Sequence, residues 1–341
     1  MPASVILLVR MTKQVLIISH APGGLLLLLA LVALLAQNVI AQPTQQLPPV
    51  CYLFSSFRNN GQDGLHLSWS TDGLHWTALN NDRSFLRPQV GKEKLMRDPC
   101  ILQGPGGIFH MVWTDSWSDR TIGYSHSTDL IHWSPQIAIP VMKDEPTARN
   151  CWAPEVVYDA SKKQFIIFWA TTIPSRFPQT TGSSESDYNH RIYCTTTPDF
   201  QTFSPTKLFY DGGFNVIDAT MLTANGKFYL IIKDETLKPV AKKNLRMAVS
   251  DKIDGPFTHV TEPFTESWVE GPTALTIGDD FFVFYDCYTR HRYGAVHSTD
   301  LRHWDDISTK ISFPPGSRHG TVFAVSSDIV RTLLGVDGKP Q

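Results

Sequence analysis

The chain has 341 residues and a formal net charge of −2, so it is long enough for a large buried core and has no basic field that would attract a nucleic acid. Aromatic residues make up 11% of the chain, with nine Trp and 23 Pro. This composition favours an all-β protein over an α/β enzyme, because aromatic side chains pack well on pleated sheets and Pro marks turns. No nucleic-acid partner is expected.

The first part of the chain differs from the rest in composition. Arg10 and Lys13 precede an apolar run over residues 25–36, and small residues lead up to Ala41. This order predicts a signal peptide over residues 1–41 and export to the periplasm or the cell exterior, with an uncleaved anchor as the alternative. The apolar run is shorter than the roughly 20 residues that a membrane span needs, so we expect no stable span after cleavage.

Residues 42–50 are rich in Gln and Pro and are predicted to form a linker to a folded domain over residues 51–341. Five cysteines follow without a CxxC pair or a histidine at metal-ligand spacing. They lie beside apolar β-rich segments, which favours buried free thiols over a structural zinc site. These residues are Cys51, Cys100, Cys151, Cys194 and Cys287.

A short phrase of the form Ser/Thr-x-Asp followed by an aromatic residue recurs along the chain. Its copies are 70–76, 127–133, 197–203, 250–257 and 298–304. The closing aromatics at 76, 133, 203, 257 and 304 are separated by 57, 70, 54 and 47 residues. Such spacing fits one four-stranded β-propeller blade per copy.

The residue types in this phrase suit a turn. The Ser/Thr and Asp oxygens can accept hydrogen bonds from nearby backbone N–H groups, and the aromatic side chain can fill the space between neighbouring blades. We therefore interpret these Asp residues as structural and not catalytic. Short β-branched and aromatic runs lie between the turns, and no segment keeps a 3.6-residue period, so the domain is predicted to be all-β. The runs are 108–113, 165–169, 228–232 and 281–285.

A second set of phrases opens each repeat, and in a propeller the first strand of each blade lies next to the central axis. Equivalent residues of these strands should therefore converge. The last phrase lies too near the C-terminus for a whole blade, and the first turn copy has no opening phrase before it. We predict a five-bladed β-propeller whose last blade is closed by strands from both chain ends. The phrases are Arg97-Asp98-Pro99, 151–155, 217–220, 269–273 and 318–322.

Three of these phrases carry an acid as their second residue, namely Asp98, Asp218 and Glu270. Glycoside hydrolysis needs one carboxylate that activates water and one carboxylic acid that protonates the leaving oxygen. Three acids at one end of the axis supply such a set, and their expected substrate is an oligosaccharide or polysaccharide.

The phrases Arg97-Asp98-Pro99, Trp152-Ala153-Pro154, Ile217-Asp218 and Glu270-Gly271-Pro272 resemble, in this order, glycoside hydrolase family 43. The resemblance covers about residues 51–325 and implies a five-bladed propeller that cleaves arabinofuranosides, xylosides or galactosides with inversion. It implies that Asp98 is the general base, Glu270 the general acid, and Asp218 the carboxylate that orients Glu270 and raises its pKa. One departure is Ala219, where the family often has Pro.

Further candidates follow from the same resemblance. His319 resembles a histidine beside a central cation or water, which leaves a structural calcium ion or an ordinary hydrogen-bonded core histidine as its alternatives. No cofactor is required for the chemistry. From its place on a predicted inner strand, Trp152 could stack on a sugar or be a packing residue, and Arg97, next to Asp98, could pair with a carboxylate or face away between blades. We expect Trp152, Arg97 and His319 to line the substrate site.

Within the hydrolase interpretation, an exo-acting α-L-arabinofuranosidase is preferred, followed by a β-xylosidase, an exo-galactosidase and an endo-arabinanase. The segment 173–190 is long enough to wall a pocket, which favours exo action. A non-catalytic carbohydrate-binding propeller is the alternative of another class, but it would not need three acids. A phosphorylase would need cations near Glu270, for which Lys233, Arg290 and Arg292 are candidates.

Overall fold

The computed structural model describes residues 10–11, 14–15 and 47–335. In the first part of the chain, Arg10–Met11 (β1) pairs antiparallel with Gln14–Val15 (β2). The predicted signal peptide otherwise lies outside the described residues and stays a prediction. No described helix has the length and apolar character that crossing a membrane requires.

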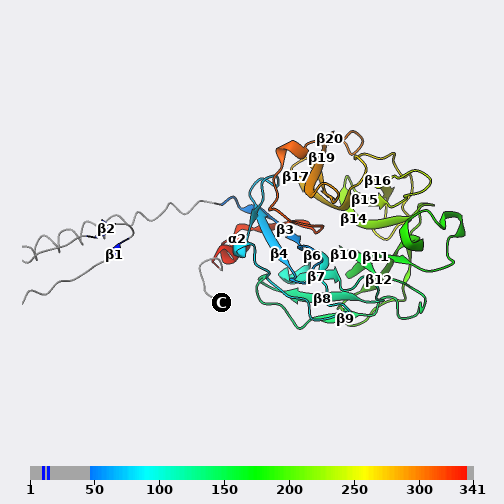
Figure 1. Cartoon of the computed structure of the whole chain (residues 1–341), viewed down its shortest axis with the longest axis horizontal. Helices are drawn as coiled ribbons and strands as arrows, with labels where there is room; N and C mark the ends of the chain where they lie inside the picture. The colour runs from blue at the N-terminus through cyan, green and yellow to red at the C-terminus, as the bar shows by residue number, and fades with distance from the viewer. Residues whose placement is uncertain (1–9, 12–13, 16–46, 336–341) are drawn as a thin grey trace, which may run out of the picture. The chain divides into compact units, whose positions relative to one another are not determined.

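From Leu47 onward the chain forms five antiparallel sheets, which follow one another around a common axis (Figure 1). Blade A contains Arg97–Gln103 (β6), Phe109–Thr114 (β7), Ile122–Ser127 (β8) and Ile137–Ile139 (β9). Blade B contains Trp152–Asp159 (β10), Gln164–Thr172 (β11), His190–Thr197 (β12) and Lys207–Tyr210 (β13). Blade C contains Val216–Ala224 (β14), Lys227–Asp234 (β15) and Asn244–Ser250 (β16). Blade D contains Glu270–Ile277 (β17), Asp280–Cys287 (β18), Arg292–Ser298 (β19) and Asp305–Asp306 (β20).

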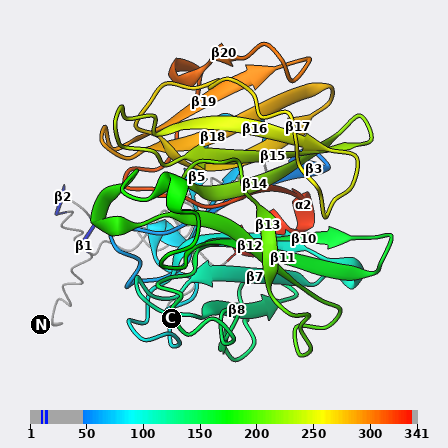
Figure 2. The ribbon, with the colours of Figure 1, turned by 90° about the vertical axis from the view of Figure 1, so that its right-hand side faces the viewer.

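Blade E joins the two ends of this domain, as the sequence predicted. Its inner strand, Val322–Ser326 (β21), pairs with Val50–Ser56 (β3), and His66–Ser70 (β4) and Thr77–Ala78 (β5) complete the sheet. The pairing aligns Val322 with Phe54, and N–H of Ser55 donates to the carbonyl of Thr321 over 3.0 Å. The prediction of a five-bladed propeller closed from both ends is therefore confirmed. Figure 2 shows blades A and D on opposite sides of the ring.

The hydrophobic core lies between the blades. Five clusters of buried side chains each join two neighbouring sheets. The turn aromatics contribute to these contacts: Trp76 of blade E meets Phe284 of blade D at 6.3 Å between ring centroids. Because each middle strand has a neighbouring blade on both faces, β11 is buried almost throughout. The aromatic at the end of each phrase thus fills an inter-blade gap, as predicted.

The turn phrases have the predicted local structure. Oδ1 of Asp129 accepts hydrogen bonds from the backbone N–H groups of Ile131 (2.9 Å) and His132 (2.8 Å). Asp72, Asp199 and Asp300 do the same in their own turns. The fourth copy departs from this pattern, because Asp251 instead pairs with Lys227.

The structure also contains short helical segments that the repeat did not indicate. Ser327–Leu334 (α2) follows β21, and its buried Val330 and Leu333 pack in the cluster that contains Cys51 and Leu53. The 3₁₀ turns are Asn80–Asp82 (η1), Pro105–Gly107 (η2), Pro178–Thr180 (η3), Glu185–Asp187 (η4) and Ser308–Lys310 (η5). All five cysteines are buried and free, which confirms the prediction from their spacing.

A β-bulge near the start of each inner strand sets the direction of the site residues. The register of blades A to D shifts after residues 97, 152, 217 and 270. The next residue in each strand has a positive φ: Asp98 (51°), Ala153 (45°), Asp218 (50°) and Gly271 (56°). A bulge re-aims the side chains of its strand. Asp98 and Asp218 therefore occupy the same place in their blades, and Glu270 lies one position earlier.

Candidate functional site

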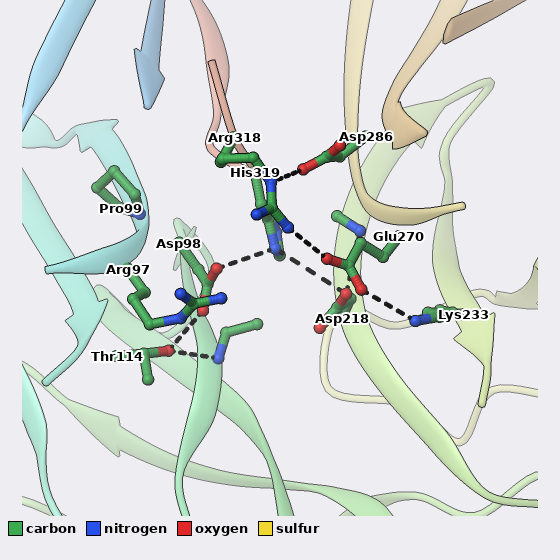
Figure 3. Close-up of polar contacts among 12 residues, drawn as sticks. Arg97, Asp98, Pro99, Thr114, Asp218, Lys233, Glu270, Asp286, Arg318 and His319 are labelled. Carbon is green, nitrogen blue, oxygen red and sulfur yellow. Dashed lines mark hydrogen bonds and ion pairs between the residues drawn. The ribbon is translucent and has the colours of Figure 1, made fainter. Parts of the chain in front are cut away.

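The inner strands bring the three predicted acids together around one histidine (Figure 3). Nδ1 of His319, which precedes β21, lies 3.3 Å from Oδ1 of Asp98 and 3.9 Å from Oδ2 of Asp218. The side chains of Asp98, Asp218 and Glu270 are 10%, 7% and 21% exposed. The site is thus largely buried, and Glu270 is its most accessible acid.

Asp98 is held as an ionised carboxylate. Thr114, at the end of β7, donates its hydroxyl to Oδ2 of Asp98 over 2.8 Å and accepts the N–H of Ala153 over 2.8 Å. Burial acts to raise the pKa of Asp98, but the charge and hydrogen bond of His319, with smaller effects of Arg97 and Thr114, lower that pKa to about 2. A carboxylate of this kind can accept a proton from an attacking water.

The pKa of Asp218 is shifted in the opposite direction to that of Asp98. Its Oδ2 accepts the N–H of Gly271 over 3.0 Å. Burial raises the pKa of Asp218 to about 6, assisted by the negative charges of Glu270 and Asp98 and opposed by His319 and Lys233. Asp218 therefore holds a proton to a higher pH than Asp98 does.

Glu270 lies between two cations. Arg318 donates to Oε1 over 3.0 Å, and Lys233 of β15 donates to Oε2 over 3.1 Å. Burial acts to raise the pKa of Glu270, but Lys233 and Arg318 outweigh it and hold that pKa below its usual value. The predicted effect of Asp218, which is to raise the pKa of Glu270, is outweighed here, because the two cations have the larger effect and the net shift of that pKa is downward.

The cations themselves belong to a longer network of alternating charge. Nζ of Lys233, which is 2% exposed, also lies 2.7 Å from Oε2 of Glu235, and Glu235 pairs with Lys243. At the other side of Glu270, Arg318 also donates to Asp286. Both cations beside Glu270 are therefore already paired with carboxylates.

Of the three cations that were candidates for binding phosphate, only Lys233 lies at this site. Lys233 contacts Glu270, whereas Arg290 and Arg292 pair with Glu266 at 2.7 and 3.6 Å. Since Lys233 is buried between two carboxylates, it does not offer a free charge to an inorganic phosphate. The structure gives no support to a phosphorylase.

His319 is a cation in this site. Burial acts to lower its pKa, but the charge and hydrogen bond of Asp98 and the charges of Asp218 and Glu270 raise that pKa to about 9. A protonated imidazole repels a metal ion, and within the described residues no three His, Cys, Asp or Glu side chains are grouped as a metal site. This donor set does not favour calcium at Nδ1, and the calcium ion stays a prediction from the sequence.

Arg97 faces the space between blades and not a carboxylate. Its guanidinium lies 4.6 Å from the ring centroid of Phe57 and 4.2 Å from that of Trp117, and it donates to Asn60 over 3.1 Å. Its charge acts on the neighbouring Asp98, whose pKa it helps to lower, and its predicted contact with the substrate stays a prediction.

Trp152 is half-buried in an aromatic group at the start of β10. Its Nε1 donates to the carbonyl of Trp117 over 2.9 Å, and its ring lies 4.8 Å from Tyr188 and 4.9 Å from His190 between centroids. Trp117 is 39% exposed. The predicted stacking of Trp152 on a sugar is not tested by these contacts, and Trp117 is a further candidate that the repeat did not indicate.

Sequence reasoning missed several residues of this site. Three polar residues lie at the end of a second strand or one residue before it, opposite Arg97, Ile217 and Glu270 of the inner strands, namely Thr114, Lys233 and Asp286. Their signal in the sequence is a polar residue that ends an apolar strand, as in Ile231-Ile232-Lys233. That signal marks the rim of the ring but does not say which acid each residue meets.

The fold and the site together define a five-bladed β-propeller with a carboxylate centre at its axis. The family described as a probable glycosyl hydrolase domain, related to glycoside hydrolase family 43, matches residues 48–329. The chain belongs to this family.

Individual proteins are similar to this chain at low sequence identity. An α-L-arabinofuranosidase of Bifidobacterium longum subsp. longum is 23% identical over 225 residues, which cover 58% of this chain and 21% of that protein. The chain thus spans about a fifth of the length of that relative. The crystal structure of a thermostable family-43 glycoside hydrolase aligns with a TM-score of 0.51 and 17% identity, covering 68% of this chain and 80% of that chain. An α-L-arabinofuranosidase from Lactobacillus brevis aligns with a TM-score of 0.49 and 18% identity, covering 62% and 72%.

Proposed function

We propose that the chain is an exo-acting α-L-arabinofuranosidase that hydrolyses its substrate with inversion. The observation that carries the proposal is the meeting of Asp98, Asp218 and Glu270 around His319, where each acid has a different environment. Inverting hydrolysis needs a deprotonated and a protonated carboxyl on opposite sides of the sugar.

In the proposed mechanism, Asp98 is the general base. Its low pKa keeps it ionised, and Thr114 and His319 fix both of its oxygens, so that it can accept a proton from water as the water attacks the anomeric carbon. His319 balances the negative charge of Asp98 in the buried site.

Glu270 is the proposed general acid, because it is the most accessible of the three acids. It must carry a proton at the moment when the glycosidic bond breaks, and it gives this proton to the leaving oxygen. Asp218 touches the backbone N–H of Gly271, next to Glu270, and its own proton is retained up to a pH of about 6. The pair Asp218 and Glu270 therefore holds one proton in mildly acidic solution, and apparent pKa values of such a pair belong to both groups.

The proposed sugar rests on the name of the Bifidobacterium relative and on the family. Exo action is supported by the segment 173–190, which is long enough to wall a pocket and from which Tyr188 contacts Trp152 at the start of β10. The exposed ring of Trp117 packs edge-to-face against Trp152, with 5.5 Å between centroids, and offers a face for a sugar.

The test is the hydrolysis of a panel of aryl α-L-arabinofuranosides, β-xylosides and β-galactosides, with NMR detection of the first anomer released. We expect α-L-arabinofuranoside to be the best substrate and the product to have inverted configuration. Asp98→Ala should abolish turnover of every aryl glycoside. Glu270→Ala should keep part of its activity on a dinitrophenyl glycoside, whose leaving group needs no proton, and lose it on a glycoside with a poor leaving group. A retained configuration, or full activity of Asp98→Ala, would refute the proposal.

We also propose that the protein is exported, on the basis of Arg10, Lys13 and the apolar run over residues 25–36. Mass spectrometry of the protein from its native host tests this, and an intact Met1 on a cytoplasmic protein would contradict it.

A further inference from the structure

We propose that Lys233 is a positioning residue that sets the ionisation of Glu270, and that Glu235 limits this effect by sharing the charge of Lys233. This inference rests on the proposed role of Glu270 as the general acid. It starts from the position of one buried lysine between the carboxylates of Glu235 and Glu270, and Figure 3 shows the contact of Lys233 with Glu270.

The geometry places Lys233 where it can act on Glu270 but cannot touch a substrate. Its Nζ lies 3.1 Å from Oε2 of Glu270, and its side chain is 2% exposed, compared with 21% for Glu270. Lys233 comes from the second strand of blade C, whereas Glu270 begins the first strand of blade D. The contact therefore crosses the blade interface and fixes the orientation of one Glu270 oxygen from behind.

Glu235 competes for the same ammonium group. Its Oε2 lies 2.7 Å from Nζ of Lys233, which is closer than Oε2 of Glu270. Lys243 pairs with the other oxygen of Glu235. Lys233 is therefore shared between two carboxylates, and any change in Glu235 alters how strongly Lys233 stabilises the charged form of Glu270.

Other groups also face Glu270, and each stays in place in the variants proposed below. Arg318 donates to Oε1 of Glu270 and also to Asp286 of β18. The remaining charged or titratable groups nearby are Asp218 of β14, His319 before β21 and Tyr288 after β18. Burial raises the pKa of Tyr288 to about 12, so this phenol is neutral over the working range.

The experiment compares two variants for which the structure predicts opposite results. Lys233→Met removes a cation from Glu270, while Glu235 keeps Lys243 and Glu270 keeps Arg318. Glu235→Gln removes the competing anion and leaves Lys233 to Glu270 alone. The alkaline limb of the pH profile of kcat/KM reports the pKa of the general acid in the free enzyme. We expect it to move up by about one pH unit or more in Lys233→Met and to move down in Glu235→Gln.

The matched control is Lys227→Met. Lys227 lies on the same strand, β15, but forms an exposed ion pair with Asp251 at 2.6 Å. This variant should leave the alkaline limb where it is. A purely structural role of Lys233 would change the stability or the rate but would not shift the limb in opposite directions in the two variants. The inference would be overturned if the alkaline limb stayed in place in Lys233→Met and Glu235→Gln, or moved in the same direction in both.

A second measurement keeps the inference separate from the proposed function. In protein labelled with ¹³C at the Glu carboxyl carbon, the resonance missing from Glu270→Gln identifies Glu270, and its pKa is read by titration without substrate. The same opposite shifts are expected there. If the wild-type protein hydrolyses no glycoside but these shifts occur, the proposed function fails and the role of Lys233 stands. If hydrolysis occurs but the resonance titrates identically in all variants, the role of Lys233 fails.

Discussion

Gly271 lies directly against the imidazole ring of His319. A Cβ atom added to Gly271 would be 2.4 Å from Cγ of His319, and Gly271 has a φ of +56°. Both facts require glycine here, because contacts this short do not occur and L-residues with a side chain rarely adopt this backbone conformation. The close approach brings the N–H of Gly271 to Asp218 and leaves His319 facing Asp98.

Gly271→Ala should therefore damage the site more than the fold. We expect a loss of about 1–3 kcal/mol in the free energy of unfolding from backbone strain and the displaced ring. We expect kcat to fall by about tenfold or more, because His319 no longer neutralises Asp98 in the same geometry. Gly278→Ala is the control, since Gly278 also has a positive φ of 61° but open space around its Cα. Equal activity losses in both variants would contradict this explanation.

His319 should stabilise the protein in a pH-dependent way. Folding raises its pKa from 6.5 to about 9, so its contribution is fully present below pH 6.5 and is lost as the pH rises through about 9. His319→Gln should lower the free energy of unfolding by about 3 kcal/mol at pH 6 and by much less above pH 9. Urea unfolding at several pH values measures this. His126→Gln, which changes an exposed imidazole of β8, is the matched control.

Glu155 should have the opposite effect on stability. It is buried on β10, where Oε2 accepts the hydroxyl of Thr220 over 2.9 Å, and burial raises its pKa from 4.5 to about 8. Because the unfolded chain releases this proton at lower pH, Glu155 costs stability as the pH rises from about 4.5 to 8. Glu155→Gln retains the acceptor for Thr220 and removes the titration. The variant should be more stable than the wild type by about 2–4 kcal/mol at pH 8 and equally stable below pH 4.5.

Glu262→Gln provides the comparison for this prediction, because Glu262 is exposed. If Glu155→Gln and Glu262→Gln have the same profile of unfolding free energy against pH, Glu155 is not neutral in the folded protein.

The repeated turns should contribute to stability one by one. Asp129→Ala removes the acceptor of two backbone N–H groups, at Ile131 and His132, which should cost about 1–2 kcal/mol in thermal or urea unfolding. Asp251→Ala, from the copy whose Asp accepts no backbone N–H in its turn, should leave the unfolding midpoint unchanged. Activity should persist in both variants, since these turns lie away from the acids. If Asp251→Ala lowers the stability of the protein and Asp129→Ala does not, the hydrogen bonds from the backbone to the Asp of the repeated phrase do not stabilise its turn.

The sequence predicted the position of the acids because the propeller repeats itself. Asp98 and Asp218 recur at the same point of their repeats, so a single spacing argument placed both on inner strands, and the structure confirms the strands. The ring closure was also predictable, because the phrase at 318–322 had no blade of its own. These conclusions need only the order and spacing of residues.

The charge state of Glu270 could not be predicted in this way. It depends on Lys233, which lies on another strand of another blade, and on Arg318 from the closing segment. Lys233 follows the apolar run over 228–232, where a lysine looks like the solvated end of a strand. Only the three-dimensional packing shows that it is buried against a carboxylate. Helix α2 was missed for a different reason, because eight residues are too few to establish a helical period.

The hydrogen bond from Ser55 to Thr321 links residues 266 positions apart, and the innermost strand of blade E follows all the other strands that the structure describes. Until Val322–Ser326 has left the ribosome, β3 has an unpaired edge and the ring has a gap on its axis. His319 arrives with the same segment, so the acids acquire their counter-charge only when the circle closes. One pairing event in the folded domain therefore completes both the ring and its carboxylate centre, and deletion of residues 318–326 would remove the inner strand of blade E and the counter-charge of the acids together.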